Sequence, residues 1–317
     1  MNFQSFEYFT VLARERSYTR AAAVLHITQQ SLSAHIAGLE KELRCQLVVR
    51  RVPLELTYGG EAFLRYATQM RRLQEQLQRE FCDIAEHQKG ELRVGIAHTR
   101  GRLLLPPVIA RFQQEYPQMA VRMVEDANDR LQKRLLEGEI DLAIARFPQS
   151  LPEVQWEEFY REEIVLLVSR TLLPQEPEDE AAVLRAMADC PLVIGSAADI
   201  AGRIGRELLE RAGIVPNITA QSDNVETLLA LCVQGVGACF CPANLVEAAL
   251  SPAQLSRLRR FSFADASYPI RFGYRKHCYQ WSVMKRFIEL AREVWTQDGA
   301  QLRSGGAFAP ALSQGEG

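Results

Sequence analysis

The chain has 317 residues, 47% of them hydrophobic and 24% charged, and it carries a formal net charge of −2 at pH 7. This length suits two or three domains, and this composition excludes a disordered chain and indicates a globular protein. No apolar run reaches the roughly eighteen residues of a membrane-spanning helix, and the first residues, MNFQSFEYF, lack the basic start and apolar core of a signal peptide, so we expect a cytoplasmic protein.

The first 43 residues predict three helices. A helix over Phe3–Arg14 has an apolar inner face, and two shorter helices joined by a tight turn follow within Ser17–Leu43. Ser17 and Thr28 are suited to cap the two shorter helices through free backbone N–H groups.

The outer face of the last of these helices carries polar side chains at its start and small side chains further along. Such a face suits entry into the major groove of DNA. Gln30 can present a donor and an acceptor together to an adenine edge, and Ser33 can bond to bases or phosphates. An ordinary helical hairpin in a protein core is the alternative for this stretch alone, because helix-turn-helix patterns are short.

A dense pattern without insertions runs from Phe9 to Leu47. Its residues are Ser17-Tyr18-Thr19-Arg20-Ala21-Ala22, Leu25, Thr28-Gln29, Leu32-Ser33, Ile36, Leu39-Glu40 and Leu43. This pattern resembles the N-terminal region of the LysR-type transcriptional regulators, with departures at Gln30, Ala34, Arg44-Cys45 and Val48-Val49. The resemblance implies double-stranded operator DNA as a partner. The candidate DNA contacts are Thr28, Gln29, Gln30, Ser31, Ser33, Ala34, His35, Arg50 and Arg51.

Two short strands around a turn are predicted over 46–51 and 53–57, as in the wing of a winged helix. Arg50 and Arg51 can reach phosphates or the adjacent minor groove, although a solvated basic turn is the alternative. Residues 1–90 hold 12 Lys and Arg against 10 Asp and Glu, so nonspecific attraction to DNA should be modest and affinity should rely on dimerisation.

A long helix is predicted over Gly60–Gln88, which contains no Pro and, after its first residue, no Gly. Apolar residues recur there at alternating spacings of three and four, which is a coiled-coil seam. They are Phe63, Tyr66, Met70, Leu73 and Leu77. An identical helix is the simplest partner for this seam, so we expect a homodimer or, as a pair of dimers, a homotetramer.

Strands and helices alternate from residue 91, which predicts parallel sheets with helices on both faces. Leu104-Leu105-Pro106-Pro107, the run 136–144 and Gly235-Val236-Gly237 resemble the LysR-family effector domain, whose two lobes are similar to a periplasmic-binding-protein type II fold. The fold class that we expect is a mostly α winged helix-turn-helix and a long linker helix, followed by an α/β two-lobed effector domain.

The predicted domains are a DNA-binding domain at 1–58, a linker and dimerisation helix with its hinge at 59–90, and an effector-binding domain at 91–297. Lobe I should cover about 91–163 and 268–297, and lobe II about 164–267. A disordered tail is expected at 298–317, which is rich in Gly, Ala, Ser and Gln.

An enzyme and a binding protein without DNA function are the competing classes. The sequence lacks a G-x-S-x-G, an H-E-x-x-H, a Walker loop and a dinucleotide G-x-G-x-x-G, so we expect neither catalysis nor a cofactor. The seven Cys are odd in number and scattered, which favours reduced structural thiols and no metal site. The helix-turn-helix argues against a binding protein that does not contact DNA.

An effector in a two-lobed fold lies in the cleft at the carboxyl ends of the strands. Several Arg near that cleft indicate a small organic anion, although each could instead be a solvated or lobe-bridging charge. The candidate effector contacts are His98, Thr99, Arg100, Arg146, Ser196, Arg203 and Asn224. RNA polymerase is a further partner that the resemblance implies.

Overall fold

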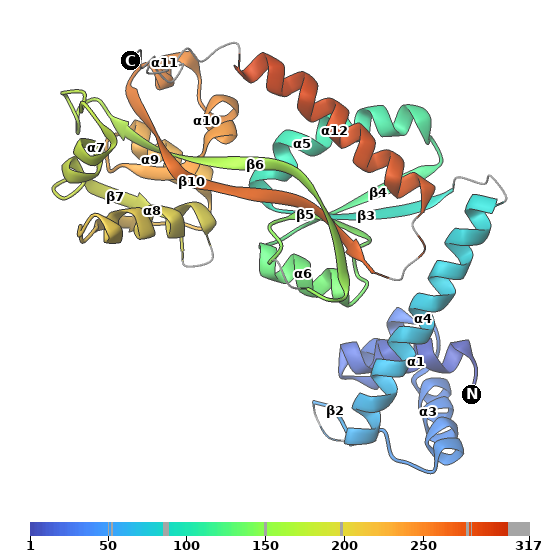
Figure 1. The fold of residues 1–317 in the computed structure, drawn as a ribbon. Coiled ribbons are helices and arrows are strands. Elements are labelled where there is room, and N and C mark those ends of the chain that lie inside the picture. Colours follow the sequence, from blue (N-terminus) through green and yellow to red (C-terminus); the bar gives the residue numbers. More distant parts are fainter. Residues whose placement is uncertain are drawn as a thin grey trace. The chain divides into compact units, whose positions relative to one another are not determined.

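The computed structural model describes residues 1–49, 51, 53–84, 89–148, 151–196, 199–276, 279 and 281–303 (Figure 1). The chain divides into two compact units. The first is Met1–Gln88 with Cys278–Trp281, and the second is Lys89–His277 with Ser282–Gly317. Each unit has its own hydrophobic core.

The first unit is a winged helix-turn-helix followed by a long helix, as the sequence predicts. Its elements are α1 (Phe3–Glu15), α2 (Tyr18–Val24), α3 (Gln29–Leu43), β1 (Val48–Val49), β2 (Glu55–Leu56) and α4 (Tyr58–Ile84). The expected caps form, because the Ser17 hydroxyl accepts the N–H of Arg20 and the Thr28 hydroxyl accepts the N–H of Ser31.

The core of the first unit joins all four helices. Phe9, Leu32 and Ile36 are fully buried, and the ring of Phe9 meets that of Phe63 edge-on at 5.0 Å, which fixes α4 against α1. Phe3, which the pattern places inward, is 56% exposed instead. It is the first residue of α1, and its ring meets that of Phe6 edge-on at 6.2 Å.

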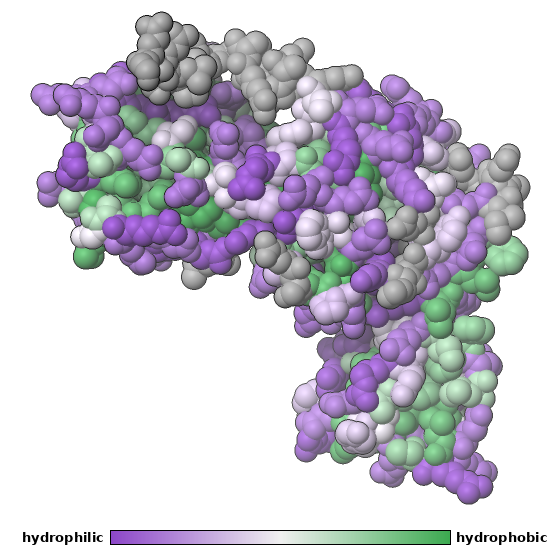
Figure 2. Space-filling model, in the orientation of Figure 1, coloured by the Kyte–Doolittle hydropathy of each residue, from purple (hydrophilic) through white to green (hydrophobic). Residues whose placement is uncertain are grey.

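The apolar seam of α4 lies at the surface beyond the core. Phe63 is buried, whereas the residues that follow it in the seam are exposed. These are Tyr66, Met70, Leu73 and Leu77, and Phe81, one residue out of register, is exposed as well. Figure 2 shows hydrophobic residues at the surface of this helix. The helix spans 27 residues.

The second unit is built on a six-stranded sheet of order β4-β3-β5-β10-β6-β9. Strands β3 (Gly90–Ile96), β4 (Met119–Glu125) and β5 (Leu142–Ala145) are parallel, and β9 (Cys239–Pro242) pairs antiparallel with β6. A separate parallel pair consists of β7 (Pro191–Ile194) and β8 (Asn217–Gln221).

Two long antiparallel strands, β6 (Val154–Ser169) and β10 (Leu258–Arg275), run through both lobes of the second unit (Figure 1). The sequence predicts two shorter strands for each, at Val154–Phe159 and Ile164–Ser169 and at Leu258–Phe263 and Ile270–Arg275, so this expectation is wrong in its boundaries. The polar residues between the apolar runs remain in the ladder, whose register shifts between Ser262 and Ser267. The predicted lobe boundaries near 163 and 268 fall at this irregularity.

Helices cover the sheets of both lobes. They are α5 (His98–Glu115), α6 (Asn128–Leu136), α7 (Glu180–Ala186), α8 (Ile200–Arg211), α9 (Val225–Val233), α10 (Ala243–Ala249), α11 (Pro252–Leu255) and α12 (Ser282–Arg303). Figure 1 shows α5, α6 and α12 beside β3, β4 and β5, and α7 to α11 at the other end of β6 and β10.

The sequence predicts helices over Arg102–Tyr116 and Tyr279–Trp295, which differ in their bounds from α5 and α12, and it predicts neither α10 nor α11. Helix α5 begins at His98 rather than Arg102, so part of the predicted loop is its first turn. Helix α12 continues to Arg303, so the expected tail is helical over 298–303, and the rest of that tail lies outside the described residues. None of the described helices is long and apolar enough to cross a membrane.

We predict that Phe112→Ala lowers the free energy of unfolding of the second unit by about 3–5 kcal/mol, because it removes a large, fully buried side chain. Its ring contacts Tyr116 at 5.0 Å and Phe287 at 5.3 Å, and this contact packs α5 on α12. Urea unfolding of the full-length protein, followed by hydrogen exchange of α5 and α12, measures the loss. Val215→Ala, at a side chain that is 86% exposed, is the control and should change stability by less than about 0.5 kcal/mol. Equal effects of the two substitutions would contradict this packing.

Candidate DNA-binding face and effector cavity

Helices α2 and α3 approach closely because the contact residues of α2 are small. Ala21 and Ala22 are buried against the core, and Leu32 and Ile36 of α3 are fully buried on the facing side. His26 occupies the turn with a positive φ of 54°. The tight crossing and short turn leave the opposite face of α3 uncovered by the rest of the unit.

The outer face of α3 begins with polar side chains and continues with small ones. Gln29, Gln30 and Ala34 are exposed, as are Ala37 and Lys41 further along the helix. Nothing lies within 4 Å of the position that a Cβ would take at Gly38. This face can therefore approach the edges of bases in a groove.

The remaining candidate DNA contacts at or near the start of α3 are partly buried or form hydrogen bonds within the first unit. Thr28 uses its hydroxyl as the cap, and Ser31 supplies the capped N–H at 3.1 Å. Ser33 is half-buried. His35 is half-buried as well, with Nε2 at 3.0 Å from the Ser5 hydroxyl.

His35 lies about 140° round the helix from Gln30, at about 100° per residue. Its ring also meets the ring of Tyr8 edge-on at 4.9 Å. The structure thus places His35 on the side of α3 that packs against α1.

The wing is a short antiparallel pair, with Val48 opposite Leu56 and Val49 opposite Glu55. The Arg51 guanidinium is exposed and forms an ion pair with the carboxylate of Glu55. Arg50 lies outside the described residues.

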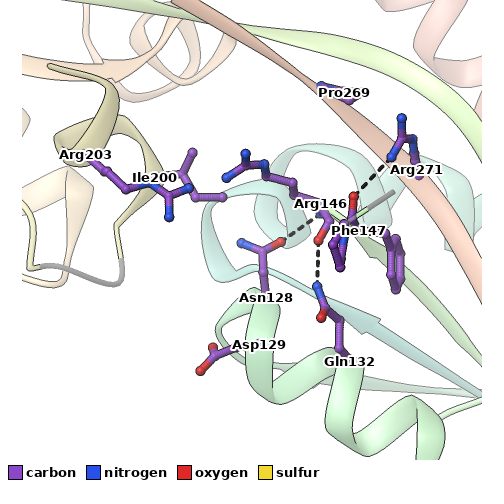
Figure 3. Close-up of a pocket in the computed structure, with 10 residues that line it drawn as sticks. Asn128, Asp129, Gln132, Arg146, Phe147, Ile200, Arg203, Pro269 and Arg271 are labelled. Carbon is purple, nitrogen blue, oxygen red and sulfur yellow. Dashed lines mark hydrogen bonds between the residues drawn. The ribbon is translucent and has the colours of Figure 1, made fainter. Parts of the chain in front are cut away.

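A cavity of about 620 Å³ opens in the second unit between its two lobes (Figure 3). Its lining comes from α6, from the end of β5, from β10 and from α8 in the other lobe. The lining residues are Asn128, Asp129, Gln132, Arg146, Phe147, Pro148, Ile200, Arg203, Pro269 and Arg271. Three guanidinium groups and several apolar side chains thus meet in one space.

Two hydrogen bonds hold the main chain at Arg146 against α6. The Asn128 Oδ1 accepts the N–H of Arg146 at 2.9 Å, and the Gln132 amide donates to the Arg146 carbonyl at 2.9 Å. The Arg146 guanidinium lies over the ring of Tyr268, 5.9 Å from its centre. In Figure 3 this guanidinium points across the cavity toward Arg203.

Of the seven predicted effector contacts, Arg146 and Arg203 line this cavity. The Asn224 side chain caps α9 by accepting the N–H of Glu226 at 2.9 Å. His98 is exposed with Nδ1 at 3.2 Å from Glu125 Oε2, while Thr99 and Ser196 are half-buried and do not belong to the described lining.

Arg100 occupies a different environment from the cleft surface that the sequence suggested. It is 5% exposed, and its Nη2 donates to Glu162 Oε2 at 2.7 Å. Glu162 also accepts hydrogen bonds from the hydroxyls of Tyr160 and Tyr268. Burial favours the neutral carboxyl, but the Arg100 charge and these hydrogen bonds hold the pKa of Glu162 below its ordinary value.

Sequence reasoning missed most of the cavity. Asn128, Asp129 and Gln132 come from the helix after β4, and Pro269 and Arg271 from the middle of β10. The carboxyl end of β4 lies at the same edge as the ends of β3 and β5, so Asn128 could have been found by the strand-end rule. Nothing local in the sequence marks Arg271, because the pairing of β10 with β5 brings it there.

Comparison with known protein families matches both units. Residues 3–61 match the model described as "Bacterial regulatory helix-turn-helix protein, lysR family", and residues 85–296 match the "LysR substrate binding domain". The chain belongs to the LysR family of transcriptional regulators. This LysR-type regulator therefore combines a DNA-binding unit with a domain that binds a small-molecule effector.

Its relatives include the uncharacterized HTH-type transcriptional regulator YcgK of Bacillus subtilis (strain 168), which is 27% identical over 94% of this chain and 96% of YcgK. The probable cat1 operon transcriptional activator of Acinetobacter lwoffii is 28% identical over 77% of this chain and 81% of its own length. Full-length CbnR in complex with its target DNA has a TM-score of 0.61 and 26% identity, over 92% of this chain and 99% of CbnR.

We predict that Glu162→Gln lowers the free energy of unfolding of the second unit by about 3–5 kcal/mol at pH 7, because the Arg100 charge stays buried without a counter-charge. The depressed pKa of Glu162 gives stability that is present above the ordinary value of about 4.3 and is lost as pH falls through the folded-state pKa. Glu162→Gln should remove this pH-dependent contribution to the free energy of unfolding. Urea unfolding between pH 3 and pH 7 measures both effects.

The control for Glu162→Gln is the double variant that also carries Arg100→Met. It removes both charges and should recover part of the stability. A double variant less stable than Glu162→Gln would argue against an uncompensated charge as the cause.

Proposed function

We propose that this LysR-type regulator reads its operator through the exposed face of α3. The observation that carries the proposal is the capped, uncovered α3, with Gln30 and Ala34 one turn apart on its outer face. A glutamine and a small side chain at this spacing suit an adenine edge followed by a thymine methyl group. Arg51, with Arg50 as its neighbour in sequence, would contact the backbone or the minor groove.

We propose that the regulator binds DNA as a homodimer joined through α4, or as a pair of such dimers. The exposed seam of α4 supports this, because a surface helix with four exposed apolar residues in register needs a partner. Beside the seam, a groove between α1 and α4 has a volume of about 540 Å³ and includes Phe3 in its lining. Two paired α4 helices would present two α3 helices to adjacent half-sites.

We propose that the cavity of the second unit binds the effector, a small organic anion. Its binding would close the two lobes, alter the packing between protomers and change the spacing or bend of the bound half-sites. The protein would act in the cytoplasm as a regulator rather than as an enzyme, with RNA polymerase as a further partner at the promoter. Its family membership supports this reading.

We predict that Gln30→Ala combined with Ser33→Ala lowers affinity for the operator about tenfold or more, because contacts to base edges are lost. Binding to unrelated DNA, and its dependence on salt, should survive, because phosphate contacts remain. Gel shifts with the DNA upstream of the protein's own gene and with a scrambled duplex measure both affinities. Gln118→Ala, at an exposed glutamine of the second unit, is the control. An unchanged preference for the operator would remove α3 from the reading role.

We predict that Leu73→Glu combined with Leu77→Glu produces a monomer, since four carboxylates would face one another across the paired seam. Operator affinity should then fall at least about a hundredfold, because each half-site is bound alone. Sedimentation of the full-length protein measures its assembly. Gln76→Glu, about 60° round the helix from Leu73 and 100° from Leu77, is the control, because it adds a charge at the edge of the seam and keeps both leucines. A dimer that persists with both substitutions would place the interface elsewhere.

A further inference from the structure

The two walls of the cavity present hydrogen-bond donors from separate lobes. On the lobe I wall, the Asn128 Oδ1 is occupied by the N–H of Arg146, so the amide nitrogen of Asn128 is left as a donor. Figure 3 shows this nitrogen on the cavity side. Within the described residues, no carboxylate forms an ion pair with the Arg146 guanidinium.

The start of α6 adds to the donor character of this wall. Its N-cap residue is Ala127, which has no side chain to accept an N–H of the first turn. Asn128 and Asp129 of that turn line the cavity. The lobe I wall therefore favours an acidic group, with Arg146 and Asn128 as its side-chain ligands.

The lobe II wall offers its donor from a side chain rather than from a helix start. Helix α8 is already capped, because the Asp199 carboxylate accepts the N–H groups of Ala201 and Gly202. The donor on this wall is the Arg203 guanidinium, which Figure 3 shows reaching toward the cavity. Its ion pair with Glu207 is 3.9 Å long, with both side chains about half exposed, so it is weak and readily exchanged.

The described lining carries more positive than negative charge, and its two guanidinium groups without a strong ion pair lie on opposite walls. Three guanidinium groups line the cavity, and Asp129 is the single carboxylate among the described lining residues. Arg271 donates to the Phe147 carbonyl at 3.0 Å, stacks on Trp156 at 3.9 Å and pairs with the Glu158 carboxylate at 3.5 Å, so it is fixed in the lobe I wall and its charge is partly balanced. A single carboxylate can pair with the guanidinium of one wall only, so closing the lobes on it would leave either Arg146 or Arg203 without an acidic group of the ligand.

We propose that the effector carries two acidic groups on a short carbon frame, one bound by Arg146 and Asn128 and the other by Arg203. This inference rests on the proposed function of the cavity. The apolar side chains of Phe147, Ile200 and Pro269 would cover the frame between the two groups. A ligand with one acidic group would bind the lobe I wall and leave Arg203 with Glu207, so it would not draw the lobes together.

The test compares acids that share a carbon frame and differ in the second acidic group. Full-length protein is titrated by calorimetry at constant ionic strength with succinate against butyrate, glutarate against valerate, and phosphoglycolate against glycolate. The first two pairs test dicarboxylates, and the last tests a carboxylate with a phosphate. At least one doubly acidic compound should bind about tenfold or more tightly than its monoacid.

Variants locate the second acidic group. Arg203→Gln should remove the preference, weakening the doubly acidic compound at least tenfold and the monoacid less than twofold. Arg146→Gln should weaken both. Arg185→Gln, at an exposed arginine of the same lobe, is the matched control and should change neither.

Three results would overturn the proposal: equal binding of each pair, a preference that survives Arg203→Gln, or no binding by any of the six acids at 10 mM. Gel shifts of the same samples distinguish a failure of the doubly acidic ligand from a failure of the proposed DNA-binding function. Operator binding by α3 that persists in the absence of acid binding would refute the doubly acidic ligand and leave the regulator function standing. Loss of operator binding in every sample would refute the DNA-reading role of α3 itself.

Discussion

The antiparallel pairing of β6 with β10 is the interaction on which the second unit depends. The ladder runs from Leu258 opposite Ser169 to Arg275 opposite Val154, and it passes through both lobes. Two continuous strands are stiffer than loops, so movement of one lobe against the other has to bend or twist this ladder. The register shift between Ser262 and Ser267 is the place where the ladder has fewest bonds to lose.

The same ladder joins the cavity to the buried ion pair. Tyr268 lies directly opposite Glu162 in the register and donates its hydroxyl to that carboxylate. The guanidiniums of Arg146 and Arg100 lie 5.9 Å and 5.8 Å from the centre of the Tyr268 ring. One aromatic side chain therefore contacts both the Arg146 guanidinium of the cavity wall and the buried Arg100–Glu162 pair.

Local chemistry made much of the fold predictable from sequence. The caps at Ser17 and Thr28 and the helical spacing of Leu32 and Ile36 depend on neighbours in the chain, so the pattern alone locates the helix-turn-helix. The long helix was predictable for the same reason, because its apolar residues alternate at spacings of three and four from Phe63 to Leu77.

The candidate site was less predictable, because tertiary pairing decides which charges are free. Arg100 looks like an exposed basic residue, yet its partner Glu162 lies 62 residues away and removes it from the surface. Arg271 enters the cavity through a strand pairing that no local pattern encodes. Arg146 and Arg203 were found because each lies near the carboxyl end of a strand, where the geometry of parallel sheets places ligands.

The ion pair in the wing bears on how the protein responds to ionic strength. For Arg51 to contact a phosphate, its guanidinium has to leave the carboxylate of Glu55, so one ion pair replaces another. Such an exchange releases fewer counterions than the arrival of an unpaired cation. The slope of log affinity against log salt should therefore be shallower than a count of the basic residues on the DNA-facing surface would give.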